Sequence, residues 1–345
     1  MAGKKSVLLS LMALSLILHA ADACFGKKKK KEHPRTGEQL LIVGGRASGS
    51  GMTAETQALD LKTMKFSELT GGTLLEPRSL QLVGAYKNDF IVAAGWNGGG
   101  LSLVSTERYK AGVKGFQAVA DVPQLRAQRY FSGASVGGSY YACGGRSQAN
   151  FKISRQCYRY SFADDKWSDV KERILGTRYH FVAVSDQVDN AKGRFLYLVG
   201  GADGRNVLAQ MVRYDTEQKE WTALNAMNTT RRAHGAAMVN GGRGILACGG
   251  RYDEKHDFMR SCELYDVASG QWRYVSSMKS RRVDFQLMTC RGRTLAVGGT
   301  GFDEGEFEAF HLLNSIEEYD YERDEWEYLP VKMPEMRAYF GAVCY

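Results

Sequence analysis

The sequence predicts an all-β fold built from six copies of one sheet unit. Glycine accounts for 39 of the 345 residues and proline for only 5, while tyrosine and tryptophan number 18 and 5. This composition is typical of short strands joined by tight turns, and 44% hydrophobic residues are enough for a sizeable core. It excludes a collagen, a coiled coil and a disordered chain. The deciding observation is a set of markers that recur about every 50 residues.

The first marker is a glycine pair that ends an apolar strand. It occurs in LLIVGG, YYACGG, LYLVGG, ILACGG and TLAVGG, with a degenerate copy in FIVAAG. The pairs begin at Gly44, Ala94, Gly144, Gly200, Gly249 and Gly298, with steps of 50, 50, 56, 49 and 49. Glycine adopts backbone angles that other residues avoid, so each pair predicts the end of a strand and a turn.

Two further markers keep the same period. The second marker is an aromatic residue, which is Phe66, Phe116, Trp167, Trp221, Trp272 or Trp326. Seven residues before each of these stands Leu59, Tyr109, Tyr160, Tyr214, Tyr265 or Tyr319. The arginine markers are Arg78, Arg129, Arg178, Arg232, Arg282 and Arg337. One such sheet cannot bury both of its faces alone, so the repeats predict sheets that stack on one another.

The order of these markers resembles the kelch repeat. Arginine, apolar strand, Gly-Gly, Tyr and then Trp seven residues later recur over residues 39–345. The resemblance implies a six-bladed kelch-type β-propeller with one four-stranded blade per repeat. The pattern begins at LLIVGG, a second strand, and ends at RAYFGAVCY, a first strand. We therefore expect the C-terminal strand to close the ring in blade one, which would comprise residues 39–72 plus 337–345.

Residues 1–23 have the layout of a secretory signal peptide. Lys4 and Lys5 precede the apolar residues 7–18, and Ala21-Asp22-Ala23 forms a small-residue cleavage site. The apolar stretch is short for a bilayer span, which makes a retained signal anchor the less favoured alternative. We expect a secreted, extracellular protein without stable membrane insertion after cleavage.

Half of the excess positive charge lies in residues 24–38. This segment contributes +4 and residues 1–23 contribute +1 of the formal net charge of +8, which leaves +3 for the remaining 307 residues. The lysine run 27–31 predicts a basic disordered leader that is either only solvated or binds a polyanion such as a sulfated glycan. The repeats themselves do not have the charge of a nucleic-acid-binding domain, so no nucleic-acid partner is expected.

Arginines are predicted to gather on one face of the ring. The connections from strand four to one and from strand two to three share a face, and the marker arginines lie beside them. We therefore expect ligand-binding arginines at Arg46, Arg146 and Arg251, which follow their glycine pairs, and at the markers Arg129, Arg178, Arg232, Arg282 and Arg337. Guanidinium groups bind carboxylate, phosphate or sulfate bidentately. The alternative is structural: regularly repeated arginines can instead cap loop carbonyls and pair with acidic neighbours.

Two pairs of cysteines occupy equivalent repeat positions. Cys143 and Cys157 are 14 residues apart, as are Cys248 and Cys262, so a disulfide is expected within each pair, with reduced buried thiols as the alternative. Cys24, Cys290 and Cys344 then leave at least one cysteine unpaired or intermolecular. Asn228-Thr229-Thr230 is the only N-glycosylation sequon, and it predicts a glycan at Asn228 on the same face.

The expected function is that of a secreted kelch-repeat binding or matrix scaffold. Its partner would be a protein, an anionic glycan or another acidic ligand, bound through the arginine-lined face. No catalytic arrangement, cofactor or metal is expected, because Glu304, Glu308 and His311 match no ligand spacing and are interpreted as a polar loop. His180 and His234 lie on the same face. Some kelch-like propellers are oxidases or sugar mutarotases, so an extracellular carbohydrate-active enzyme is the alternative.

Overall fold

The computed structural model describes residues 39–49, 51–99, 102–123, 128–187, 192–253, 258–305 and 310–345. The predicted signal peptide, the basic leader and Cys24 lie outside these ranges. The described regular structure consists of β-strands and one 3-10 turn, η1 (Asn240–Gly242). No helix within the described part is long and apolar enough to cross a membrane.

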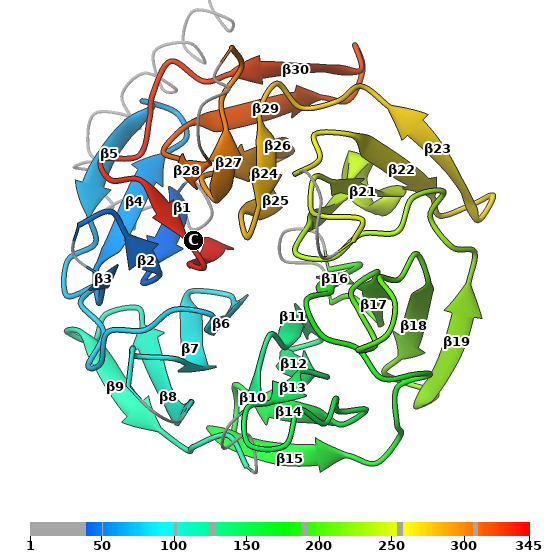
Figure 1. Ribbon diagram of the computed structural model, residues 1–345. Coiled ribbons are helices and arrows are strands. Elements are labelled where there is room, and N and C mark those ends of the chain that lie inside the picture. Colours follow the sequence, from blue (N-terminus) through cyan, green and yellow to red (C-terminus); the bar gives the residue numbers. More distant parts are fainter. Residues whose placement is uncertain are drawn as a thin grey trace, which may run out of the picture. The chain divides into compact units, whose positions relative to one another are not determined.

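Six four-stranded antiparallel sheets, the blades, make up most of the described structure (Figure 1). Blade one comprises β32 (Gly341–Cys344), β1 (Gln39–Val43), β4 (Thr56–Asp60) and β5 (Lys65–Glu68). Blade two comprises β6 (Leu82–Tyr86), β7 (Asp89–Gly95), β8 (Leu103–Lys110) and β9 (Phe116–Val119). Blade three comprises β11 (Ser132–Val136), β12 (Ser139–Cys143), β14 (Cys157–Ser161) and β15 (Lys166–Val170).

The remaining blades repeat the same order from the inner to the outer strand. Blade four comprises β16 (Val182–Ser185), β17 (Phe195–Val199), β18 (Met211–Asp215) and β19 (Glu220–Leu224). Blade five comprises β20 (Gly235–Val239), β21 (Gly244–Cys248), β22 (Cys262–Asp266) and β23 (Gln271–Val275). Blade six comprises β25 (Gln286–Cys290), β26 (Arg293–Val297), β29 (Ile316–Asp320) and β30 (Glu325–Tyr328).

Short strands pair outside the blades. They are β2 (Arg46–Ala47), β3 (Gly51–Met52) and β31 (Arg337–Ala338) in one sheet, and β10 (Gln128–Arg129) with β13 (Arg146–Ser147) in a second. The third sheet contains β24 (Arg281–Val283), β27 (Thr300–Phe302) and β28 (His311–Leu312). These strands belong to the connections between blades and between the second and third strands, so they place the arginines discussed below.

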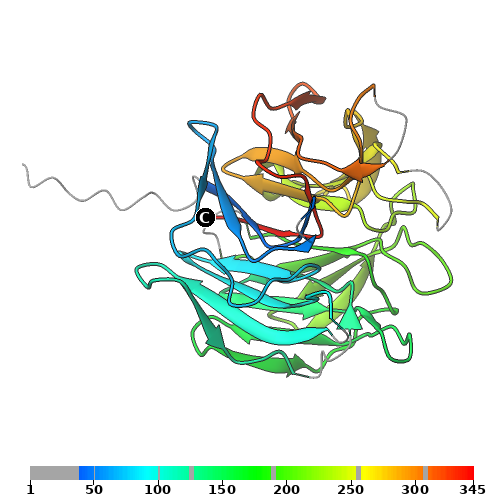
Figure 2. The ribbon, with the colours of Figure 1, turned by 60° about the vertical axis from the view of Figure 1, so that its left-hand side comes forward.

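The blades form a ring in which each inner strand touches the inner strands of its two neighbours. Contacts run in order through β6, β11, β16, β20, β25 and β32 and return to β6. The C-terminal strand β32, red in Figure 2, pairs with the blue strand β1 from Leu40 opposite Cys344 to Val43 opposite Gly341. Reciprocal backbone hydrogen bonds of 3.0 and 2.8 Å between Gln39 and Tyr345 extend this pairing. Blade one therefore joins both ends of the described chain, and the predicted all-β fold is confirmed.

The tyrosine and tryptophan markers form aromatic pairs between the third and fourth strands. A tight turn makes residues seven apart face each other, as Tyr214 faces Trp221 and Tyr265 faces Trp272. Their ring centroids lie 4.9 and 5.2 Å apart. These rings contribute to the apolar clusters between neighbouring blades, where each aromatic pair adds about 0.5–1.5 kcal/mol beyond its buried area. The seven-residue spacing is thus explained by cross-strand packing.

The glycine pairs are required because atoms of the connections between blades lie against them. Gly200 and Gly201 have φ of 58° and 98°. A Cβ atom at Gly201 would lie 2.8 Å from the carbonyl oxygen of Tyr179 and 2.7 Å from the Cβ of Phe181. Both the backbone angle and this close approach therefore favour glycine.

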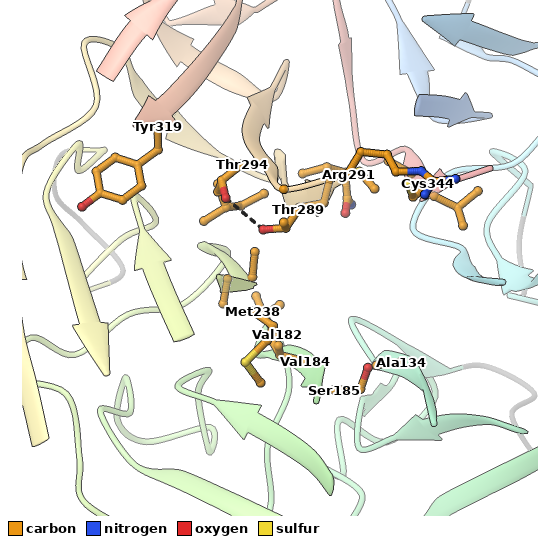
Figure 3. Close-up of a pocket in the computed structure, with 18 of the residues that line it drawn as sticks. Ala134, Val182, Val184, Ser185, Met238, Thr289, Arg291, Thr294, Tyr319 and Cys344 are labelled. Atoms are coloured by element: carbon orange, nitrogen blue, oxygen red, sulfur yellow. Dashed lines mark hydrogen bonds between the residues drawn. The ribbon is translucent and has the colours of Figure 1, made fainter. Parts of the chain in front are cut away.

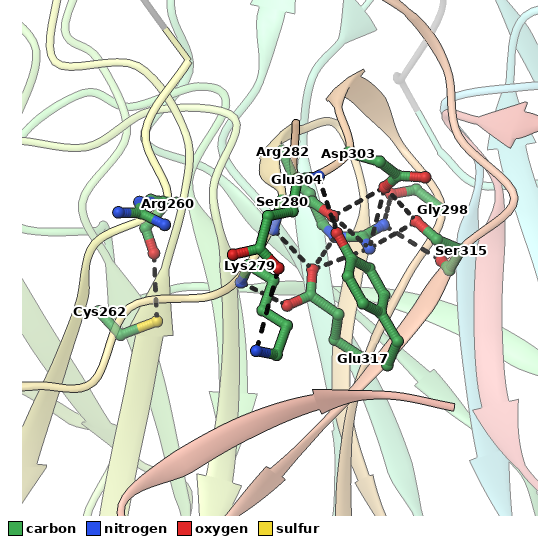
Figure 4. Close-up of polar contacts among 11 residues, drawn as sticks. Arg260, Cys262, Lys279, Ser280, Arg282, Gly298, Asp303, Glu304, Ser315 and Glu317 are labelled. Atoms are coloured by element: carbon green, nitrogen blue, oxygen red, sulfur yellow. Dashed lines mark hydrogen bonds and ion pairs between the residues drawn. The ribbon is translucent and has the colours of Figure 1, made fainter. Parts of the chain in front are cut away.

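A buried arginine occupies the start of most blades. Arg282 is fully buried, and its Nε and Nη2 donate to Glu317 Oε1 at 3.0 and 2.9 Å, while its Nη1 donates to the carbonyl oxygen of Gly298 at 2.8 Å (Figure 4). Glu317 also accepts the backbone N–H groups of Lys279 and Ser280 at 2.6 and 3.1 Å. The arginine therefore ties the connection between blades to two strands of the following blade.

The buried arginine recurs in other blades, with or without a glutamate as its ionic partner. Arg231 contacts Glu263 at 3.2 Å, and Arg78 contacts Glu107. In blade four Val212 stands where a glutamate would lie, so Arg178 donates only to backbone carbonyls at 3.2–3.4 Å. Burial lowers the pKa of Arg178 to about 10.

Three predicted ligand-binding residues need correction. Arg178, Arg282 and Arg337 are only 2%, 0% and 0% exposed. Arg337 donates to the carbonyl oxygens of Gly44 and Glu55 and pairs with Glu335 at 3.0 Å. These three arginines are used inside the blades, which agrees with the structural alternative and not with a ligand-binding role.

Candidate functional site

Six residues at equivalent positions surround one end of the central channel. Each lies two residues after the buried arginine position and two residues before the first strand of a blade. We call this group the collar: Leu80, Tyr130, His180, Ala233, Asp284 and Tyr339. None is glycine, yet all six have φ between 52° and 60°. This left-handed conformation is unfavourable for non-glycine residues and persists only where the surroundings fix it.

Backbone hydrogen bonds between blades hold the collar in place. The N–H of His180 donates to the carbonyl of Tyr130 at 2.9 Å, and the N–H of Ala233 donates to the carbonyl of His180 at 2.9 Å. The series continues from Asp284 to Ala233, from Tyr339 to Asp284 and from Leu80 to Tyr339, at 3.0, 3.2 and 2.9 Å. The collar is therefore a fixed backbone frame on which the side chains differ from blade to blade.

Two pairs of arginines flank His180 in this frame. Arg129 precedes Tyr130 and pairs with Arg146 between β10 and β13. Arg232 precedes Ala233 and pairs with Arg251 through backbone hydrogen bonds of 3.0 and 2.9 Å. We call the surface that carries Arg129, Arg146, Arg232 and Arg251 the arginine face. Among the residues that the structure describes, none of these four forms an ion pair.

Aromatic rings support three of the four guanidinium groups. The carbon Cζ of Arg129 lies 4.2 Å from the ring centre of Trp96, and that of Arg251 lies 4.4 Å from the ring centre of Phe258. Arg146 lies 4.8 Å from Phe151 and 5.5 Å from Tyr179. Stacking orients a guanidinium plane and leaves its N–H edge free to donate. The Nε atoms of Arg129 and Arg232 are buried and have no hydrogen-bond partner within the described residues.

The sequence matches the KLHDC2/KLHL20/DRC7 Kelch-repeats domain over residues 130–345. The chain belongs to the kelch-repeat family. It is 24% identical to Kelch-like protein 23 of Mus musculus over 80% of this chain and 44% of the relative. It is 26% identical to Kelch-like protein 36 of Bos taurus over 84% of this chain and 46% of the relative. The chain thus spans less than half the length of these relatives.

The fold is also similar to that in the solved structure of YjhT. The two chains share 12% sequence identity, with a TM-score of 0.63 over 77% of this chain and 87% of YjhT. This likeness concerns the fold alone.

The register of the kelch repeats corrects the series of marker arginines. Sequence spacing places Arg129 and Arg232 in one series with Arg178. The structure shifts both by one position, because the equivalents of Arg178 are Gln128 and Arg231. Arg129 and Arg232 are for this reason only partly buried, whereas Arg231 is fully buried. They remain candidates together with Arg146 and Arg251, while Arg46 is exposed in blade one, opposite Ala338.

Positive charge dominates the centre of the arginine face. Burial, together with the charges of Arg232, Arg251 and Arg146, lowers the pKa of His180 to about 3, so this histidine is neutral at pH 7. Its ring lies 3.8 Å from that of Tyr130, and neither of its nitrogens has a hydrogen-bond partner among the described residues. Burial also lowers the pKa of His234 to about 3.

Asp284 is the acidic member of the collar. Burial raises its pKa to about 6, and the hydrogen bond with Tyr339 and the charges of Arg251 and Arg232 oppose this shift. The negative charge of Asp284 in turn raises the pKa of Tyr339. One carboxyl group therefore interacts with two arginines, so the arginine face keeps a net positive charge.

The channel continues from the collar to a larger cavity at its other end. A cavity of about 180 Å³ lies against the collar, and one of about 920 Å³ lies beyond it. Small side chains such as Ala134 and Ser185 line the larger cavity, together with Thr289 and Thr294, whose hydroxyl groups lie 2.9 Å apart (Figure 3). No group of three or more His, Cys, Asp or Glu residues suited to a metal ion occurs in the described ranges.

The cysteines come together in three pairs. Cys143 lies at bonding distance from Cys157, and Cys248 from Cys262, each pair in register between the second and third strands. Sequence analysis left Cys290 and Cys344 unassigned, and the structure pairs them between blade six and the closing strand β32. No local spacing could show this third pair, because its members meet only when the ring closes.

Sequence analysis missed most of the collar and its aromatic neighbours. Tyr130, Asp284 and Tyr339 carry no motif of their own. Their signal is positional, since each stands two residues after the buried arginine position. Asn228, the predicted glycosylation site, is exposed near this face, and its backbone N–H donates to Glu263 at 2.6 Å. Glu308 lies outside the described residues.

Proposed function

We propose that this kelch propeller is a non-catalytic scaffold that binds an acidic segment of a partner protein on the arginine face. The observation that carries the proposal is the set of four arginines without an ionic partner in the described structure. A buried or half-buried guanidinium without a carboxylate is costly, whereas a bound carboxylate or phosphate supplies charge-assisted hydrogen bonds.

The composition of the face favours a protein over a simple polyanion. Trp, Tyr and Arg dominate the energetically important centres of protein interfaces. Here arginines stack on Trp96, Tyr179 and Phe151. Phe151 and Tyr252 are also 65% and 45% exposed, which is high for large aromatic side chains. Apolar side chains of a protein segment can cover these rings while its acidic groups bind the arginines.

We also propose that the protein is exported and oxidised. The support is the predicted signal peptide together with three cysteine pairs at bonding distance, since disulfides persist in extracellular compartments. Non-reducing peptide mapping of the secreted protein should recover peptides that link Cys143 to Cys157 and Cys248 to Cys262. Free thiols at Cys143 and Cys248 would contradict the proposal.

Calorimetric titration with a capped acidic peptide and with heparin tests the binding function. Four forms are compared: the intact protein, a form lacking residues 24–38, Arg129→Ala/Arg146→Ala/Arg232→Ala/Arg251→Ala, and the control Lys166→Ala/Arg273→Ala, which removes two exposed charges from outer strands. We expect the quadruple variant to lose peptide binding, the control to keep it, and deletion of residues 24–38 to reduce only the salt-dependent part.

Two results would refute the proposal. If deletion of residues 24–38 abolishes binding and the quadruple variant binds normally, the arginine face is structural. If heparin binds through the four arginines and the peptide does not, the partner is a glycan. Thermal unfolding of each variant shows whether a loss of binding comes from misfolding.

A further inference from the structure

We infer that blade four has a site for a small monovalent anion, at the position where three other blades have a glutamate carboxylate. The protein groups that bind it would be the guanidinium of Arg178 and the backbone N–H groups of Leu175 and Gly176. The anion would be a structural ligand inside the blade, separate from any partner on the arginine face, so the inference does not depend on the proposed function.

The glutamate carboxylates of the other blades have the same set of partners. In blades two, five and six, Glu107, Glu263 and Glu317 each contact the buried arginine. Each also accepts, at 2.6 Å, the backbone N–H of the residue three positions before that arginine. Glu263 and Glu317 accept the N–H of the residue two positions before it as well, at 3.1 Å, as Figure 4 shows around Glu317. One carboxylate therefore satisfies a buried guanidinium and the N–H groups of the preceding connection together.

Blade four keeps the backbone of this arrangement but not the carboxylate. Val212 stands at the strand position of Glu317, and a valine side chain ends before the carboxyl group of a glutamate would begin. The connection before the arginine is held in the same way in both blades. The residue four positions before the arginine donates its N–H to the preceding loop, at 3.0 Å from Ile174 and at 2.9 Å from Met278. The donors of the site are therefore placed as in the blades that have a glutamate.

These donors have no acidic partner in the described part of the chain. Arg178 is 2% exposed, its Nη1 donates only to carbonyl oxygens at 3.2–3.4 Å, and its Nε has no hydrogen-bond partner among the described residues. The N–H groups of Leu175 and Gly176 likewise have no acceptor within the described ranges. A buried charge without a counter-charge is costly, and charge-assisted hydrogen bonds to an anion would offset that cost.

The missing group determines which anions fit. The other blades accommodate one carboxyl group with a single negative charge, which balances one guanidinium. Chloride and formate meet both limits, whereas sulfate is larger and carries a second charge that Arg178 alone does not balance. Leu175 and Gly176 are exposed, so the anion would bind next to solvent.

The test measures thermal unfolding while sodium formate or sodium chloride replaces sodium gluconate at constant ionic strength. Gluconate is a monovalent anion that is too large for the site. We expect the Tm of the wild type to rise by about 2 °C for each tenfold increase of formate or chloride above its dissociation constant, because the anion binds the folded protein and not the unfolded chain.

Val212→Glu supplies the missing carboxylate and is the matched variant. In gluconate its Tm should exceed that of the wild type by at least about 3 °C. Its response to formate and chloride should be lost, although it keeps the arginine face and experiences the same bulk salt effects. Val212→Gln adds the length of the side chain without the charge and should not raise the Tm. The reciprocal variant Glu263→Val in blade five should have a lower Tm, part of which formate or chloride restores.

Three results would overturn the inference. The first is a wild-type Tm that is the same in formate, chloride and gluconate. The second is an equal response to these anions in the wild type and in Val212→Glu, because the anions would then act elsewhere. If Val212→Glu does not fold, the third result decides: a Tm of Glu263→Val that neither formate nor chloride raises above its value in gluconate.

Discussion

Replacing Glu317 by glutamine should destabilise the propeller far more than replacing its neighbour Glu318. Glu317 is fully buried and accepts hydrogen bonds from Arg282 and from the backbone N–H groups of Lys279 and Ser280. The glutamine amide cannot accept all of these and leaves the Arg282 charge without a counter-charge. Breaking a buried pair in this way costs about 3–5 kcal/mol, which corresponds to a decrease in Tm of roughly 5–10 °C in a domain of this size.

Glu318→Gln is the matched control in the same strand. Glu318 binds Arg293 at 2.7 Å with both side chains more than a quarter exposed, and such pairs contribute about 0–1 kcal/mol. Calorimetric or fluorescence-detected thermal unfolding of both variants measures the difference. Equal decreases in Tm would refute the argument, because burial would then not determine the strength of these ion pairs.

Three further predictions concern pH, closure and export. Asp284→Asn should raise the free energy of unfolding by about 1–3 kcal/mol at pH 7 and change it little below pH 4. The pKa of Asp284 is raised to about 6 in the folded protein, so the wild type loses stability as the pH rises from about 4 to 6. An equal increase at both pH values would contradict this. Replacing Cys290 and Cys344 by serine should lower the free energy of unfolding by about 2–4 kcal/mol, measured by denaturant titration against the oxidised wild type, and an unchanged midpoint would show that the pair does not stabilise ring closure. N-terminal sequencing of the secreted protein should find a start near Cys24, and a membrane-bound form with Met1 intact would refute cleavage.

The fold could be predicted from sequence because packing contacts within and between blades require particular residues at fixed positions of each repeat. The seven-residue step from Tyr214 to Trp221 reflects cross-strand stacking, and the glycine at position 201 reflects a backbone contact that leaves no room for a Cβ atom. The pairing of β32 with β1 follows from counting the strands at the two ends of the repeats. The first two constraints involve residues close in sequence or at a fixed offset, and the third involves only a count of strands, so one chain is sufficient to show all three.

The site could be predicted only in part because the same residue type plays two roles. Arg231 and Arg232 are adjacent, yet the first is buried against Glu263 and the second lies on the arginine face. A sequence signal for the structural role does exist in the glutamates Glu107, Glu263 and Glu317, which occur at equivalent strand positions. Blade four lacks this signal, because Val212 stands at the position of the glutamate although Arg178 is still buried.

The collar combines a uniform backbone with side chains that differ between blades. All six collar residues have nearly the same φ, although their side chains range from Ala233 to Tyr339. Because hydrogen bonds between main-chain groups fix the collar backbone, the fold does not require one particular side chain at these positions. His180 and Asp284 are therefore better indicators of function than the regularly repeated arginines. The repeat requires the arginines for packing, whereas it requires no particular side chain at the collar positions.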